Sequence, residues 1–155
     1  MSNKPATTTG APPIMVADLI LRDEPEKLIS FAEQFGSELS NSKLSTSQIR
    51  LAFGQIRQIE AMWRIPSQQA QAERLLLLLK PRMAYQTARE NNAGNALLQE
   101  ILSKGIDAVY ENTSAASTER AVRFHRFVDL CEALLAYHKV TEVKNRSRLG
   151  HARHD

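Results

Sequence analysis

The chain has 155 residues, of which 43% are hydrophobic and 24% charged, and its formal net charge is +3. This length and balance suit one globular domain with a sizeable core, and a single cysteine, Cys131, excludes an internal disulfide. No apolar run approaches the roughly 20 residues of a membrane span and no signal segment is evident, so we expect a cytoplasmic protein without membrane contact.

The first third of the chain predicts an arm and one helix. Residues 1–13 offer little to bury and predict a disordered arm ahead of a helical domain over 14–140. Residues 16–21 can form a short turn or an arm. Pro25 follows two acids and opens an apolar pattern of helical spacing, which predicts a helix over 24–39.

A capping box marks the next helix, because Ser45 is followed three residues later by Gln48. Apolar residues from Ile49 to Trp63 recur on one face of this helix. Arginines repeat every seven residues beside that face, at Arg50, Arg57 and Arg64. Such a row favours a solvated surface, and a contact with a phosphate backbone is the alternative.

The five successive leucines of Leu75–Leu79 cannot share one stripe of a helix, so we expect them to be covered on nearly every side at the centre of the core. Pro81 predicts that the helix ends or kinks at residue 79 or 80 and that a second helix begins there. Tyr85 is expected in the core rather than as a stacking platform.

The last part of the chain predicts two more helices. Residues 91–95 form a break in which Gly94 and the asparagines can take positive φ, and an apolar helical pattern follows over 97–110. After a polar connector, Thr118 can cap a final helix that buries Cys131 and His138, and residues 141–155 predict a basic flexible tail. No stretch alternates as a strand does, so we predict an all-α, single-domain bundle of five or six helices.

Charge is distributed unevenly. Four successive segments, 1–42, 43–89, 90–118 and 119–155, carry net charges of −3, +6, −3 and +3. Positive charge concentrated in the middle and at the end of a chain is expected when one face meets a polyanion.

Few residues suggest catalysis. The chain has no His-Glu-x-x-His motif, no paired cysteines, no acidic cluster at ligand spacing and no glycine-rich phosphate loop, so we expect no metal and no cofactor. Arg120 followed by His125 resembles the signature of the small helical HEPN ribonucleases. There the histidine would act as acid or base at a 2′-hydroxyl while the arginine steadies the phosphate. Such a pair arises easily in an arginine-rich chain, so this is an alternative.

Several motifs in order resemble one family. They are the run from Leu44 to Arg50, the leucine-rich segment from Leu76 to Tyr85 with Arg89 beyond it, Phe124-His-Arg-Phe127 and Glu132-Ala-Leu-Leu-Ala-Tyr-His138. Together they are similar, over about 44–139, to the small helical subunit of type III-A CRISPR effectors, the second member of the Csm series.

This resemblance implies a non-enzymatic protein present in several copies, which stack beside the crRNA-bearing backbone and help to hold crRNA and target RNA. Its partners would be the backbone subunit, which cleaves the target, the large polymerase-like subunit, and further copies of itself. A helical adaptor without nucleic acid is the third alternative.

The positive charge suits sequence-independent contacts with an RNA backbone whose sequence is read by pairing. The residues expected to contact phosphate are Arg50, Arg57, Lys80, Arg82, Arg89, Arg123, Arg126 and Lys139. We expect these side chains to converge into one electropositive track.

Overall fold

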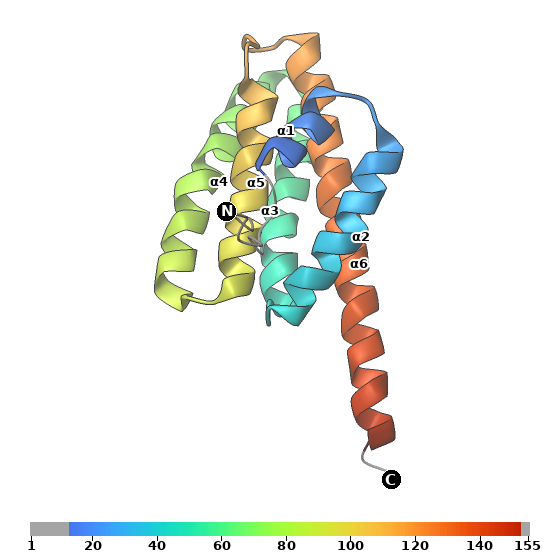
Figure 1. Cartoon of the computed structure of the whole chain (residues 1–155). Coiled ribbons are helices and arrows are strands. Elements are labelled where there is room, and N and C mark those ends of the chain that lie inside the picture. The colour runs from blue at the N-terminus through green and yellow to red at the C-terminus, as the bar shows by residue number, and fades with distance from the viewer. Residues whose placement is uncertain (1–12, 153–155) are drawn as a thin grey trace, which may run out of the picture.

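The computed structural model describes residues 13–152, with side chains from 16 to 150, and six α-helices and one 3-10 turn make up this part of the chain (Figure 1). They are α1 (Pro13–Leu21), α2 (Pro25–Asn41), α3 (Thr46–Trp63), η1 (Pro66–Gln68), α4 (Gln69–Glu90), α5 (Ala93–Tyr110) and α6 (Thr118–Ala152). These residues contain no strand, so the predicted all-α class is confirmed. The expected N-terminal arm falls outside the described residues, apart from Pro13.

Helices α3 to α6 form the body of the bundle. Each packs on the next along the chain, and α6 returns to α3, so the four close a ring in which neighbouring helices run in opposite directions (Figure 1). Short connections between antiparallel neighbours produce this arrangement. Helix α2 lies along α6, and α1 packs across α5 and α6. Trp63 stacks on Phe124 inside the ring, with centroids 4.3 Å apart.

The start of α3 confirms the predicted capping box. The Gln48 amide donates to Ser45 Oγ at 3.2 Å, and the Ser45 amide donates to Gln48 Oε1 at 3.0 Å. Leu44, just ahead of the cap, is buried, and its carbonyl oxygen lies 2.6 Å from Nε2 of the buried His138. The carbonyl can only accept, so Nε2 carries the proton and ties α6 to the corner between α2 and α3.

Two expectations for the leucine-rich segment were wrong. Leu76 and Leu79 are buried, but Leu77 and Leu78 are 46% and 39% exposed, because α4 packs only against α3, α5 and η1 among the described elements. Helix α4 also continues through Pro81, so it does not end at residue 79 or 80 and no second helix begins there. The proline removes the donor that would bond the Leu77 carbonyl, and both residues face solvent, where water can replace the lost donor.

Two further local predictions need correction. Asn91 alone carries the positive φ of the α4–α5 break, at 45°, whereas Gly94 lies inside α5 without positive φ. Gly94 is needed for close packing instead, because a Cβ there would stand 2.8 Å from the Cβ of Leu44. The cap of α6 is Ser117 rather than Thr118, since Ser117 Oγ accepts from the Arg120 amide at 3.1 Å.

The last helix is longer than the sequence suggested. Residues 141–152, expected within the flexible tail, continue α6, which extends beyond the end of the bundle (Figure 1). Near the start of this extension Asn145 donates to Asn41 Oδ1 at 3.1 Å. Flexibility of the tail in solution stays a prediction.

Candidate nucleic-acid interface

The eight cations expected to contact RNA lie on several different surfaces of the bundle. They are divided among the outer side of α3 with α6, a groove between α3 and α4, the α4–α5 side, the end of α5, and the end of α1. The contact of each with RNA stays a prediction. The expectation of one continuous track is not met by their placement.

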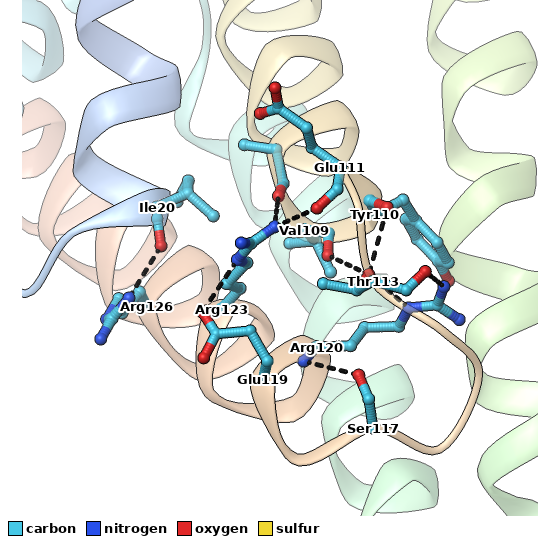
Figure 2. A network of polar contacts seen from close by, with 11 residues as sticks. Ile20, Val109, Tyr110, Glu111, Thr113, Ser117, Glu119, Arg120, Arg123 and Arg126 are labelled. Atoms are coloured by element: carbon cyan, nitrogen blue, oxygen red, sulfur yellow. Dashed lines mark hydrogen bonds and ion pairs between the residues drawn. The ribbon is translucent and has the colours of Figure 1, made fainter.

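Three of these cations are held by contacts within the protein. Arg123 Nε donates to Glu119 at 3.1 Å, and its Nη1 donates to the Ala108 carbonyl at 3.1 Å and to that of Glu111 (Figure 2). Arg126 donates to the Ile20 carbonyl at 3.1 Å. Lys80 forms an ion pair with Asp107. Arg123 and Arg126 satisfy carbonyl groups at the ends of α5 and α1, which explains why they border a buried face.

Three more cations lie on the surface formed by α3 and α6, which also carries acids. Arg57 forms an ion pair with Glu132 at 3.0 Å, and Lys139 follows Glu132 by two helical turns on α6. The pKa of the Glu142 carboxyl is below its usual value, chiefly because Thr46 donates a hydrogen bond to it. Nearby positive charge, which includes Arg50, lowers this pKa further, whereas partial burial opposes the shift. Mixed charge therefore covers the α3–α6 surface.

The remaining two, Arg82 and Arg89, border a groove between α3 and α4 that encloses about 330 Å³. Tyr85 stands between them and Leu51 forms the other wall, while Gln86 and Glu90 complete the lining. Across residues 16–150, neither arginine has a hydrogen bond or ion pair. The single acid, Glu90, accepts hydrogen bonds from Gln48 and Asn95 instead. We call these six residues the α3–α4 groove.

Tyr85 was expected in the core, and this was wrong, because its side chain is 69% exposed. The sequence contained the signal for its position, since Arg82 and Arg89 stand three residues before and four after it, on the same face of a helix. The signal was missed because the leucine-rich segment was taken to be covered on all sides.

Arg120, the arginine of the alternative ribonuclease site, is not available to a substrate. Its Nη1 lies 2.7 Å from Glu73 Oε1, its Nε donates to Thr113 Oγ1 at 2.9 Å, and its Nη2 donates to the Thr113 carbonyl at 2.6 Å. Its guanidinium also lies 4.5 Å from the ring centre of Tyr110 (Figure 2). The side chain is only 10% exposed, whereas His125 faces solvent, so the two do not form a site.

Residues 16–150 also give little evidence of a metal site, a cysteine nucleophile or a membrane span. They contain no group of three or more His, Cys, Asp or Glu side chains placed to hold a metal ion. Burial raises the pKa of the Cys131 thiol well above its usual value, so the thiol stays protonated and is a poor nucleophile. In the same part of the chain, no helix is long and apolar enough to cross a membrane.

These features define an all-α bundle in which two exposed arginines, Arg82 and Arg89, share an open groove with the exposed Tyr85. A family model, Csm2 Type III-A, matches residues 22–144, and the chain belongs to this family. The resemblance seen in the sequence is thereby confirmed. No curated protein and no solved structure matches the chain.

Proposed function

We propose that this protein is the non-catalytic small subunit of a type III-A Csm effector complex, which acts in the cytoplasm, associates with the other Csm subunits, and binds crRNA and target RNA through their backbone. Membership of the Csm2 Type III-A family supports the assignment to the complex. The observation that carries the RNA contact is the α3–α4 groove, where Arg82 and Arg89 have no ion pair with any acid of the described side chains. Exposed guanidinium groups bind phosphate without reading base sequence.

The eight predicted contacts divide into two sets on this proposal. Arg82 and Arg89 form the main contact, with Arg50, Arg57 and Lys139 on the neighbouring α3–α6 surface as weaker ones. Lys80, Arg123 and Arg126 bond groups of the protein itself, and a phosphate would have to compete with those groups.

Binding of labelled single-stranded RNA at several salt concentrations tests the RNA contact. The double substitution Arg82→Ala/Arg89→Ala should weaken binding and reduce the slope of log affinity against log salt by about 1.4, since each lost contact with a single strand removes about 0.7. Lys27→Ala/Arg64→Ala is the matched control, because it removes the same charge from side chains that are 71% and 68% exposed elsewhere. An equal change of slope in both variants would show that RNA binding depends only on net charge, and it would contradict the assignment of Arg82 and Arg89 as the RNA contact.

Purification from the native host tests the assignment to the complex. The crRNA and the other Csm subunits should co-purify with the tagged chain. A chain that is recovered without RNA or Csm subunits would support the helical adaptor instead.

We also infer that the copies associate head to tail. Helix α6 presents Ala136 and Val140 near the end of the bundle, and Val143 on its extension, along one exposed stripe. Lys139 lies on one side of this stripe, and Lys144 and Arg148 lie on the other. Residues 18–38, on α1, α2 and the loop between them, carry six acids and two bases. Ile29 is 45% exposed in a groove between this segment and α6, which we call the α1–α2 groove. Its charged lining is acidic in balance, with Asp23, Glu24, Asp129 and Glu132 against Arg22 and Arg126.

Charge complementarity favours the pairing of these two different surfaces. Two α6 stripes facing each other would bring like charges together, whereas α6 against the α1–α2 groove brings bases to acids. The N-terminal end of α2 and the free end of α6 lie toward opposite ends of the molecule (Figure 1). A contact between two such surfaces is heterologous and can continue from copy to copy.

A mixing experiment tests this arrangement by sedimentation velocity. Val143→Asp and Ile29→Asp, each at an exposed side chain, should separately prevent growth beyond a monomer, because each disables one of the two surfaces. An equal mixture should form a dimer through the intact surface of each variant. A symmetric α6–α6 contact predicts that Ile29→Asp has no effect and that mixing restores nothing.

A further inference from the structure

Tyr85 stands out among the aromatic residues. The chain has nine of them, all within the described part, and Tyr85 alone is exposed, whereas the other eight are buried or partly buried. Covering an aromatic ring lowers the free energy, so a ring that is 69% exposed can contribute to the binding of a partner that covers it.

The charge around Tyr85 narrows the choice of partner. Arg82 and Arg89 bracket the ring along about 10 Å of helix axis, and neither forms an ion pair within residues 16–150. Glu90, the acid of the groove, accepts hydrogen bonds from Gln48 and Asn95. A ligand that matches this surface has a flat apolar face and negative charge on either side of it. A nucleotide in a single strand has both, because its base is flat and phosphates flank it along the strand.

The opposite wall of the groove leaves room for such a base. Leu51, on α3, is 61% exposed and adds an apolar surface across from the ring. One turn further along α3 is Gly54, where even an added Cβ would meet nothing within 4 Å. Gln86 contributes an amide that can donate or accept at a base edge.

We propose that Tyr85 is a stacking platform for one unpaired base of RNA, and that Arg82 and Arg89 hold the phosphates on either side of that nucleotide. This inference rests on the proposed RNA contact and adds the class of ligand, which is a single-stranded or extruded nucleotide. A continuous duplex hides the faces of its bases and offers this groove only its backbone, so it should bind through the arginines alone.

Three substitutions distinguish the contribution of the aromatic ring to RNA binding from that of apolar surface alone. Tyr85→Phe keeps the ring, Tyr85→Leu keeps apolar surface without a ring, and Leu149→Ala removes an apolar side chain of similar exposure, 67%, on the α6 extension. The probe is a fluorescein-labelled oligouridylate of about ten nucleotides, with binding followed by anisotropy. We expect Tyr85→Phe and Leu149→Ala to bind as the wild type does, and Tyr85→Leu to bind about tenfold more weakly.

A second probe carries abasic nucleotides in place of the uridines and keeps every phosphate. The wild type should lose about tenfold in affinity for it, whereas Tyr85→Leu should bind both probes equally, because the ring and the base act as a pair. A duplex of the same length should not distinguish the wild type from Tyr85→Leu.

Each result has a distinct meaning. If Tyr85→Leu binds the single strand as the wild type does while Arg82→Ala/Arg89→Ala does not, the stacking proposal is overturned and the RNA contact stands. If the arginine variant also binds normally, the RNA contact itself fails. If Tyr85→Leu leaves RNA binding intact but loses self-association or a Csm subunit, the groove is a protein contact and stacking is refuted.

Discussion

Removing the positive charge of Arg120 should destabilise the protein rather than impair a reaction. The variant Arg120→Met keeps most of the apolar stem but leaves the Glu73 carboxylate without its cation, in a side chain only 11% exposed. It also removes the donors to Thr113 Oγ1 and the Thr113 carbonyl, which hold the α5–α6 loop to the start of α6 (Figure 2).

The expected loss of stability follows from the burial of the Arg120–Glu73 ion pair. Breaking a buried ion pair on one side costs about 3–5 kcal/mol, and we expect about 3 kcal/mol here because both side chains keep a tenth of their surface exposed. The same cost should follow from Glu73→Leu. The double variant should cost less than the sum of the two by at least about 2 kcal/mol, because neither charge is then left alone.

Urea unfolding at pH 7, followed by far-ultraviolet circular dichroism, measures these differences, and fluorescence of Trp63 provides a second probe. A cost below about 1 kcal/mol for Arg120→Met, or costs that simply add in the double variant, would refute the structural role of the pair. A ribonuclease activity that vanished in Arg120→Met while stability was unchanged would revive the alternative site.

Two further predictions concern packing and titration. Gly54→Ala should stabilise the protein by about 1 kcal/mol in urea unfolding, because the added Cβ meets open space. Gly36→Ala should destabilise it by about 2 kcal/mol, because the added Cβ would stand 2.7 Å from the Cβ of Tyr137 and 2.9 Å from the Leu134 carbonyl oxygen. Equal effects would contradict the close contact of α2 with α6. Burial, and then the charge of Glu73, raise the pKa of Tyr110 to about 12, against the opposing charge of Arg120. The folded state therefore holds this proton more tightly than the unfolded chain, and stability should fall by about 1 kcal/mol as pH rises from about 10 to about 12, a loss reduced by solvent screening and absent in Tyr110→Phe. Ultraviolet titration should show a tyrosine of pKa about 12 that the same substitution removes.

Much of the fold was readable from local pattern. The spacing of apolar residues indicated helices where α2, α3, α5 and α6 occur, and the capping box at Ser45 located the start of α3. These signals are reliable because a cap, a heptad stripe or a break involves residues within a few positions of one another. The motifs that resemble the Csm family are of the same kind.

The features of the fold that local pattern did not predict depend on neighbours that are distant in sequence. Leu77 and Leu78 are exposed because no further helix of residues 13–152 covers the outer side of α4, and Pro81 is tolerated there for the same reason. Gly94 is required because the chain at Leu44 passes against it, although Gly94 itself resembles an ordinary turn residue. A one-dimensional pattern carries no information about which face of a helix is left without a partner.

The distribution of charge was likewise predicted in part by the sequence and decided in part by the tertiary structure. Composition and spacing were enough to indicate an all-helical bundle with cations concentrated in its middle and last helices. Only the folded chain showed that Lys80, Arg123 and Arg126 bond groups of the protein, while Arg82 and Arg89 stand open beside Tyr85. The physical reason is that a helix follows from short-range preferences, whereas a charge is free or neutralised according to which side chains the tertiary packing places within a few ångströms of it.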